Sequence, residues 1–411
     1  MTRDLVTGMR PFTSTISLDE ARRRLAGAVV PMARTECVSL VDATGRVAAA
    51  DVESRVDVPP FARSAMDGYA VIAAETVSAS RQAPARLRMV ERIYTGQLPT
   101  RSIASGECAE IATGAALPDG ADAVIMVEET ATEGVDVVGL FAAAMPGQNV
   151  SPRASDIAAG TVVVRLGEPL NPARVGAIAA IGHRDLQVYE RPRVAILSTG
   201  NEVVEPGEPL APGQIFDVNR FTLAAIVAAH GGIPQAHAPA HDTVDALVAA
   251  LDACVLAADI VVFSGGSSVG ERDLIRDAIA ARGEMIFHGI AVKPGKPTAF
   301  AILGGTPFFG MPGNPTSCLS NAYVLLVPFL RATARLPPLA PRVVRVPLGR
   351  GIVSVAGRHQ FYTVRLADGS AFPAFKGSGD ITSLSQADGY IEIAPDQSTV
   401  EEGAVVEVTL F

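Results

Sequence analysis

The chain has 411 residues, of which 48% are apolar and 19% charged, and its formal net charge is −9. This length predicts several domains, because single cores stop growing near about 250–300 residues. The acidic balance argues against a general nucleic-acid or membrane-surface binder, since both need a basic face. Without a signal-like or membrane-spanning segment and with four scattered cysteines, the sequence predicts a cytoplasmic protein with reduced thiols.

The first third of the sequence predicts a helix and then a β-rich unit. In SLDEARRRLAGAVV (17–30), Ser17 is an N-cap candidate with Glu20 three residues later, which is a capping-box pattern. Residues 52–150 form short alternating segments broken by Gly and Pro pairs, as in small β domains. Asp67–Gly68 lies between apolar flanks, which predicts a hairpin turn.

From residue 171 onward, helical and strand patterns alternate. Helices are expected at 171–182, 219–232, 242–258, 273–283 and 314–334, and strands at 193–198, 259–263, 284–292 and 298–303. This alternation predicts a parallel, doubly wound sheet with helices on both faces. A proline-rich joint (335–342) follows, and residues 343–411 then alternate like a β-barrel or sandwich.

Three loops are candidates for ligand binding, because ligands of open α/β sheets sit beyond the carboxyl ends of strands. They are STGNEV (198–203), SGGSSVGERD (264–273), and KPGKP (293–297) with the later GMPGNPTS (310–317). The second is typical of an anion site, because its glycines expose N–H groups and its serines add hydroxyls. The alternative is a simple strand-to-helix turn.

The charged residues of these loops each have two interpretations. Asp273 either shares Mg²⁺ with a bound phosphate or caps a helix. Lys293 and Lys296 flank a rigid Pro–Gly turn and either hold an anion or are solvated. Asp67 and Glu202 can equally be turn residues.

Familiar nucleotide motifs are absent. GGSSVG lacks the GxGxxG spacing, and GIAVKPGKP lacks that of a P-loop. His237 and His241 are four residues apart, but Pro239 disfavours the helix that would align them on a metal.

Six ordered motifs resemble one family. They are SAMDGYA (64–70), TGAALPDGADAV (113–124), STGNE (198–202), SGGSSVGERD, VKPGKP (292–297) and GMPGNPTS, with GSGDITSLSQADGYI (377–391) in the last unit. The chain resembles the molybdopterin molybdenumtransferases, the MoeA family to which the gephyrin E domain is related.

The resemblance implies a multidomain α/β plus β architecture. It comprises a discontinuous, elongated linker domain (13–58 and 152–188), an inserted β-rich domain (59–151), a doubly wound molybdopterin-binding α/β domain (189–336) and a C-terminal β-barrel (337–411). It also implies a homodimer, whose active cleft lies between the α/β domain of one protomer and the inserted domain of the other. Other proteins of cofactor biosynthesis are candidate partners.

The resemblance further implies that adenylylated molybdopterin and molybdate react with Mg²⁺, releasing AMP and leaving molybdenum on the dithiolene. The catalytic candidates are Asp67, Glu202, Asp242, Asp273, Lys293 and Lys296, and the candidate Mg²⁺ ligands are Asp273, Glu202 and Asp242. The substrate-binding candidates are Thr113, Ser264, Gly265, Gly266, Ser267, Ser268, Gly270, Pro312, Asn314 and Pro315.

The sequence departs from the family pattern in three places. Ala154–Ser155–Asp156 replaces a frequent Gly–Glu–Asp, Asn201 replaces a frequent aspartate, and Ser267 replaces a common valine. The alternatives are a non-catalytic, gephyrin-type scaffolding protein and the adenylylating enzyme of the same pathway. The retained acids and lysines favour the transferase over the first, and the extra β domains favour it over the second.

Overall fold

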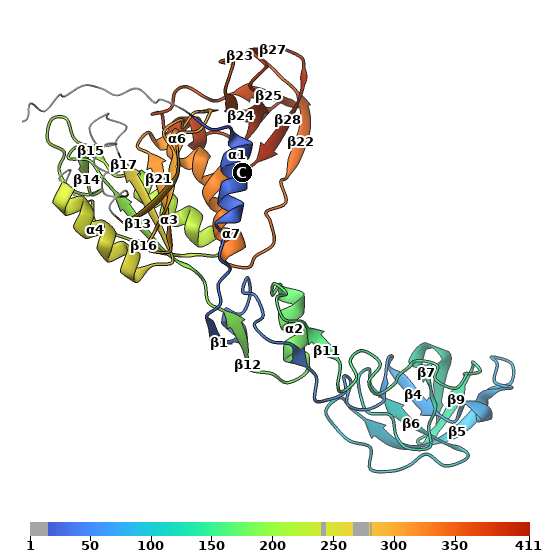
Figure 1. Ribbon diagram of the computed structural model, residues 1–411. Coiled ribbons are helices and arrows are strands. Elements are labelled where there is room, and N and C mark those ends of the chain that lie inside the picture. The colour runs from blue at the N-terminus through green and yellow to red at the C-terminus, as the bar shows by residue number, and fades with distance from the viewer. Residues whose placement is uncertain (1–14, 240–243, 266–278, 280–281) are drawn as a thin grey trace, which may run out of the picture. The chain divides into compact units, whose positions relative to one another are not determined.

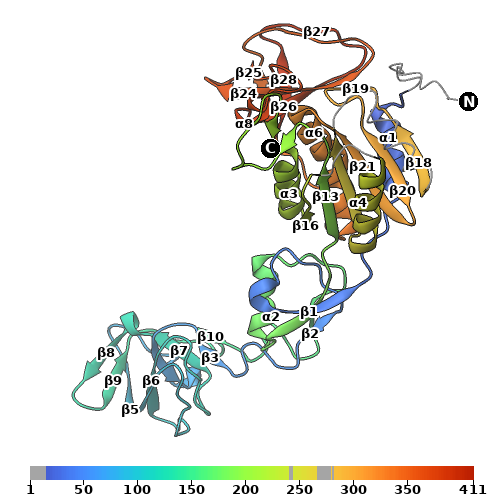
Figure 2. The ribbon, with the colours of Figure 1, turned by 90° about the vertical axis from the view of Figure 1, so that its left-hand side faces the viewer.

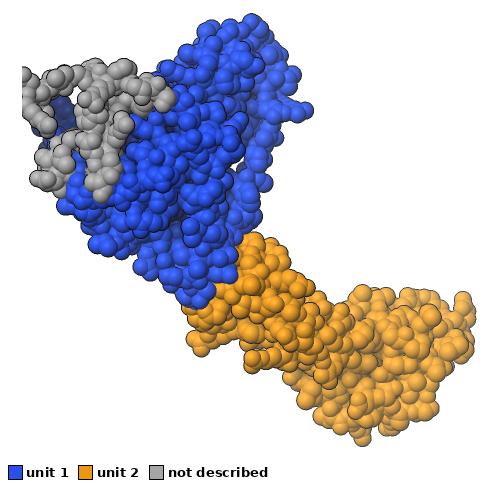
Figure 3. Space-filling model, viewed as in Figure 1, with its two compact units in different colours: residues 1–36, 189–411 blue, residues 37–188 orange. Residues whose placement is uncertain are grey.

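The computed structural model describes residues 15–239, 244–265, 279 and 282–411. The chain divides into two compact units, one of residues 1–36 with 189–411 and one of residues 37–188 (Figure 3). Among the described residues, no helix combines the length and the apolar character needed to cross a membrane.

The unit of residues 37–188 is built mainly from strands. Its largest sheet has six strands in the order β7-β4-β6-β5-β9-β8. They are β4 (Gly68–Val71), β5 (Ala85–Ile93), β6 (Glu107–Ile111), β7 (Ala123–Met126), β8 (Thr130–Glu133) and β9 (Val137–Leu140). Two further pairs join β2 (Val52–Glu53) to β11 (Val162–Val164) and β3 (Arg63–Ser64) to β10 (Val150–Ser151). Strands β1 (Thr35–Ser39) and β12 (Asp185–Tyr189) lie at the boundary of the two units.

The expected helix near residue 171 is present as α2 (Pro172–Ala180). Asn171 caps it, because its side-chain oxygen accepts a hydrogen bond from the Arg174 N–H at 2.9 Å. Pro172 stands in the first turn, where a missing N–H costs nothing.

The hairpin expected at Asp67–Gly68 is wrong. Strand β3, before these residues, pairs with β10, whereas β4, after them, pairs with β6 and β7. Gly68 is needed for another reason. A Cβ at this position would lie 1.9 Å from the carbonyl oxygen of Ile125, so only glycine allows β4 and β7 to come this close.

The turn that contains Ala154 lies at one departure from the family pattern and shows why glycine suits this position. Ala154 has φ +60°, a left-handed conformation that costs an L-residue energy and that glycine adopts freely. The turn is held by Asp57, whose carboxylate accepts hydrogen bonds from the Ala159 N–H at 2.9 Å and the Arg153 guanidinium at 2.5 Å. These two contacts lower the pKa of Asp57.

The larger unit contains a six-stranded sheet in the order β16-β13-β17-β21-β20-β18 (Figures 1 and 2). Its strands are β13 (Arg193–Ser198), β16 (Ile233–Ala236), β17 (Ile260–Gly265), β18 (Gly283–His288), β20 (Ala299–Leu303) and β21 (Thr306–Pro312). Four strands are parallel as expected and β18 runs in the same direction, but β20, between β18 and β21, is antiparallel to both. The difference arises because Gly304–Gly305 closes a tight turn between β20 and β21, and the sequence pattern did not indicate β21 as a strand.

Helices cover both faces of this sheet, as expected. Alternate residues of each strand point to opposite faces, so Val194 and Ile196 join one core whereas Ala195 and Leu197 join the other. The helices are α1 (Leu18–Gly27), α3 (Asn219–Ala229), and α6 (Pro315–Asn321) with α7 (Val327–Thr333) on the first face, and α4 (Val244–Ala257) on the second. Ser17 caps α1 by accepting from the Glu20 N–H at 3.2 Å.

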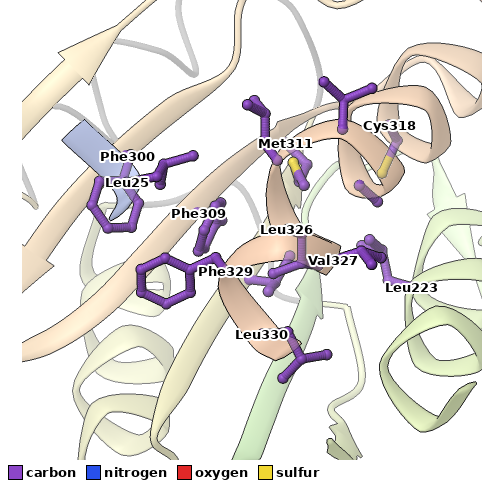
Figure 4. Close-up of a cluster of buried hydrophobic side chains, with 14 of the residues drawn as sticks. Leu25, Leu223, Phe300, Phe309, Met311, Cys318, Leu326, Val327, Phe329 and Leu330 are labelled. Atoms are coloured by element: carbon purple, nitrogen blue, oxygen red, sulfur yellow. The ribbon is translucent and has the colours of Figure 1, made fainter. Parts of the chain in front are cut away.

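Aromatic packing fixes the centre of the first core (Figure 4). The rings of Phe300 and Phe309 have centroids 4.9 Å apart, and Phe329 lies 5.2 Å from Phe309. Phe329 belongs to α7, which continues from α6 through a π-helical segment, Ala322–Leu326. The wider turn occurs just before Pro328, which has no N–H to donate to the preceding turn. The long helix expected at 314–334 is therefore confirmed, with a local change of pitch.

The last part of the chain forms a second sheet, in the order β19-β24-β26-β28-β22, with β25 beside β24. Its strands are β19 (Val292–Lys293), β22 (Val343–Pro347), β24 (His359–Ala367), β25 (Ser370–Pro373), β26 (Gly389–Ile393) and β28 (Val405–Leu410), accompanied by β23 (Ile352–Val353), β27 (Thr399–Val400) and α8 (Thr382–Ser385). A bridge from Leu348 to Ala371 joins the end of β22 to β25, so the strands follow a nearly closed path.

Ala154→Gly should stabilise the unit of residues 37–188 by about 1 kcal/mol, because glycine relieves the left-handed strain. Chemical denaturation should show a higher midpoint for the transition of this unit. Ala158→Gly, at an exposed position of the same turn without positive φ, is the matched control and should lower the midpoint. A lower midpoint for the Ala154 variant would contradict the inference that the left-handed backbone at Ala154 costs stability.

Candidate functional site

Beyond the carboxyl ends of β13, β17 and β21 lies a cavity of about 480 Å³. This volume suits a medium-sized organic ligand. Strands β14 (Val203–Val204) and β15 (Ile215–Phe216) form one wall. The described residues that line this first cavity are Ser198, Thr199, Glu202, Val203, Ile215, Phe216, Asp217, Val218, Asn219, Ser264, Gly265, Gly313, Asn314, Pro315, Gly379 and Ile381.

A second cavity of about 420 Å³ adjoins the first and shares the exposed side chain of Asn314 with it. The Nδ2 of Asn314 donates to Ser378 Oγ at 3.0 Å, which ties α6 to the C-terminal segment. The described residues that line this second cavity are Val292, Lys293, Pro294, Gly295, Lys296, Pro297, Pro312, Asn314, Ser317, Arg358, Phe375, Gly377 and Ser378.

Buried polar residues hold the lysine turn of the second cavity in place. The side chain of Asn321 is fully buried and its Nδ2 donates to the carbonyl oxygen of Gly295 at 2.9 Å. The hydroxyl of Thr298 donates to the same oxygen at 2.9 Å. Gly295 has φ +102°, and a Cβ there would lie 2.2 Å from the Asn321 amide, so the turn requires glycine. Lys293 and Lys296 thus start from a fixed backbone.

The turn before α3 links the ends of three strands. The Asn219 Nδ2 donates to Ser264 Oγ, at the end of β17, and to the Gly313 carbonyl oxygen after β21, both at 2.7 Å. Asp217 Oδ1 accepts from Ser198 Oγ, at the end of β13, at 2.9 Å. All of these side chains are at most 8% exposed, so the bonds are shielded from water.

An arginine completes this turn. Arg220 Nε lies 3.3 Å from Asp217 Oδ2, its Nη1 donates to the His237 carbonyl oxygen at 2.9 Å, and Nη2 pairs with Glu205. A buried carboxylate is tolerated only when it is paired in this way. The ion pair and the hydrogen bond from Ser198 place the Asp217 carboxylate against the end of β13.

The two cavities differ in charge. Among their described lining residues, the first contains the carboxylates of Glu202 and Asp217 and no Lys, Arg or His. The second contains Lys293, Lys296 and Arg358, all partly buried, and no Asp or Glu. Anions are therefore favoured in the second cavity, whereas the first favours neutral or cationic groups.

The structure places several predicted site residues together. Ser264, Gly265, Glu202 and Pro315 line the first cavity, Pro312 and both lysines line the second, and Asn314 lines both. The hydroxyl of Ser264 is buried and accepts from Asn219. Burial raises the pKa of the neighbouring Cys318 thiol to about 12, which keeps it protonated.

Asp67 and Thr113 belong to the other unit, where they contact each other. The Thr113 N–H donates to Asp67 Oδ1 at 2.7 Å, and both residues are exposed. Six predicted site residues lie outside the described residues: Asp242, Gly266, Ser267, Ser268, Gly270 and Asp273. The helix expected at 273–283 falls largely in the same gap.

The sequence alone did not indicate Asp217, Asn219 and Arg358 as site residues. The first two stand in FDVNR, where a polar pair before an apolar run resembles an ordinary helix start. Arg358 follows a Gly in the C-terminal β unit, far from the lysines in sequence. Only the pairing of β19 with β24 brings it to the lysine turn.

Comparison with known proteins identifies the chain. Residues 16–182 match the MoeA N-terminal region (domain I and II), residues 195–332 a probable molybdopterin-binding domain, and residues 345–411 the MoeA C-terminal region (domain IV). Molybdopterin molybdenumtransferase 2 of Mycobacterium tuberculosis is 35% identical over 399 residues, covering 95% of this chain and 98% of the relative. The molybdopterin molybdenumtransferase of Haemophilus influenzae is 30% identical over 410 residues, covering 96% and 98%.

Solved structures agree. Two crystal structures of the MoeA molybdopterin biosynthesis protein of Pyrococcus horikoshii superimpose with TM-scores of 0.83 and 0.82 at 39% and 29% identity. They cover 97% of this chain and 99% and 100% of theirs. The fold and the molybdopterin-binding domain define a transferase of molybdenum cofactor biosynthesis. More specifically, the chain belongs to the MoeA family of molybdopterin molybdenumtransferases, which confirms the resemblance of the six motifs.

Asn219→Ala should weaken molybdopterin binding roughly tenfold, because Ser264 and the Gly313 carbonyl each lose a hydrogen bond of about 1 kcal/mol and the loops they belong to are no longer tied. Isothermal titration calorimetry measures the affinity. Asn219→Asp keeps the size but loses the donor and adds a buried carboxylate without a cation, so it should weaken binding at least as much.

Asn171→Ala is the matched control, since it removes a similar amide from the cap of α2 in the other unit. It should lower stability without changing the affinity. Unchanged binding by both Asn219 variants would show that the hydrogen bonds from Asn219 to Ser264 and Gly313 do not shape the site.

Proposed function

We propose that the two cavities bind adenylylated molybdopterin and molybdate side by side. Water adds to phosphorus as the phosphoanhydride bond of the first substrate breaks, and AMP leaves. Two Mo–S bonds form between the molybdenum of molybdate and the dithiolene sulfurs, whose two protons leave with one molybdate oxygen as water. The observation that carries this proposal is the separation of charge between two adjoining cavities of one family member. One cavity suits the neutral organic part of a substrate, and the other suits an oxyanion.

We assign the oxyanion to the second cavity. Lys293, Lys296 and Arg358 supply positive charge there, and the hydroxyls of Ser317 and Ser378 line the same space. Molybdate carries four oxygens around its metal, so it accepts hydrogen bonds from several directions. Donors fixed on a rigid turn need little reorganisation when the anion binds.

The acids belong to the first cavity and its surroundings. We propose that Glu202, with Asp242 and Asp273, positions Mg²⁺ and the substrate phosphates, and that the loop from Ser264 to Gly270 contacts those phosphates. The described residues contain no group of three or more His, Cys, Asp or Glu that could hold a metal. Magnesium at phosphates needs only one or two carboxylates, so Glu202 fits this use. Bound Mg²⁺ supplies charge neutralisation between phosphates and acids.

The described residues contribute mainly by positioning. Asn314 lies where the cavities meet, so it can contact both substrates. The protonated Cys318 supplies no nucleophile, and none is needed when two reactants are held in contact. We place the reaction in the cytoplasm, because all four cysteines are free thiols.

The decisive test measures AMP release by the purified protein from adenylylated molybdopterin. Release should require molybdate and Mg²⁺. Arg358→Ala should raise the molybdate concentration for half-maximal release about tenfold, since a charge-assisted hydrogen bond is lost.

Arg365→Ala is the control, because this arginine lies on the same strand, β24, is exposed and lines neither cavity. It should leave the molybdate dependence unchanged. No AMP release from the wild-type protein would refute the proposed reaction. Equal effects of the two arginine variants would refute the assignment of the oxyanion.

We also propose the four-domain division of the family and a homodimer, in which Asp67 and Thr113 serve the cavities of the partner. Exposed apolar side chains lie next to Asp67: Met66 precedes it and is 43% exposed, and Val127, whose N–H donates to the Asp67 carbonyl oxygen at 3.0 Å, is 49% exposed. Such side chains are typical of a protein interface. Light scattering at micromolar concentration should give the mass of a dimer, and a monomeric mass would contradict this arrangement.

A further inference from the structure

The first cavity has an apolar wall that the acids and phosphates do not explain. Ile215 and Phe216, on β15, line the cavity and are 56% and 41% exposed. Pro315 and Ile381 also line it, and Ile381 is 48% exposed. Large apolar side chains in contact with water beside a cavity indicate a surface that a ligand covers.

The backbone around Phe216 is held on both sides. The Ile215 N–H donates to the Glu202 carbonyl oxygen and the Asp217 N–H to the Val204 carbonyl oxygen, each at 2.8 Å. Asp217 is itself anchored through Ser198 and Arg220. Phe216 therefore stands between two fixed residues, and an aromatic side chain with only two rotatable bonds loses little entropy when a ligand stacks on it.

The charge of the cavity selects the kind of ligand group. Glu202 and Asp217 are the charged side chains among its described lining residues, and both are acids. Together with the hydroxyls of Ser198 and Thr199, they favour N–H donors and disfavour a bare anion. A flat nitrogen heterocycle satisfies both surfaces, since its face is apolar and its edge carries amino and ring N–H groups.

We propose that Phe216 forms the platform on which a flat heteroaromatic ring of the substrate stacks. This inference rests on the proposed function, because adenylylated molybdopterin supplies two such rings, the pterin and the adenine. Both have the same stacking chemistry, and they are distinguished by testing the two halves of the substrate separately. The ring binds on the Phe216 side of the first cavity while the oxyanion binds in the second.

The experiment compares Phe216→Ala, Phe216→Tyr and Phe221→Ala with the wild-type protein. Calorimetry gives the affinities for adenylylated molybdopterin, for molybdopterin and for AMP. Base stacking on an aromatic side chain corresponds to roughly a 5- to 150-fold change in affinity, so Phe216→Ala should weaken binding of the whole substrate by a factor in this range. Phe216→Tyr keeps the ring and should bind within about threefold of wild type.

Phe221→Ala is a demanding control. Phe221 is 50% exposed, lies under the Arg220 guanidinium at 4.9 Å and lines neither cavity. Its removal disturbs the same turn without touching the platform. The affinities should stay at the wild-type values, and thermal unfolding should show that all variants are folded.

Each outcome decides the matter. A loss with molybdopterin alone assigns the pterin to Phe216, and a loss with AMP alone assigns the adenine. Wild-type affinity of Phe216→Ala for all three ligands would overturn the platform while leaving the proposed reaction intact. Equal losses in Phe221→Ala would overturn it as well, because the effect would then come from the turn. A wild-type protein that binds none of the ligands would overturn both the platform and the proposed reaction.

Discussion

The side-chain amide of Asn219 is the interaction on which the geometry of the cavities depends. Strand ends diverge as a twisted sheet fans out, and the loops that leave them need a common anchor. One amide group, buried and bonded to both Ser264 and the Gly313 carbonyl, supplies it for β17 and β21. Asp217 extends the anchor to β13 through Ser198. The polar atoms remain in place because each of these bonds is shielded from water.

Separation of opposite charges is the second organising feature. An oxyanion and a nucleotide phosphate repel each other, and at about 4 Å this repulsion is roughly 4 kcal/mol in a protein surface environment. The cation-lined cavity supplies a counter-charge to an oxyanion, whereas the adjoining acid-lined cavity favours neutral and cationic groups, so the two cavities select different chemical groups. Asn314 is neutral and carries both a donor and an acceptor, so it can lie between the two environments without favouring either.

The sequence could predict elements whose signals are local. The cap of α1 at Ser17, the bounds of β13 and the long helix from Pro315 follow from capping and periodicity. The direction of a strand and the identity of its neighbouring strands depend on distant parts of the chain. The predictions of a hairpin at Asp67–Gly68 and of a fully parallel sheet were therefore wrong. The site shows the same division. Its motifs indicated Glu202, Lys293, Lys296 and Asn314, whereas Arg358 becomes a neighbour only through strand pairing.

The pairing of β19 with β24 has a consequence for how this chain could be divided. Val292 pairs with His359, and Lys293 pairs with Gln360. Strand β19, which leads into the turn of residues 293–297, is therefore part of the C-terminal sheet. Gene fission at the proline-rich joint would therefore leave the first fragment with an unpaired edge and without Arg358. Neither fragment would contain the whole cation-lined cavity. The proline-rich joint separates two parts of the sequence, but residues from both parts line the cation-lined cavity. The parts before and after the joint must therefore stay together in one chain.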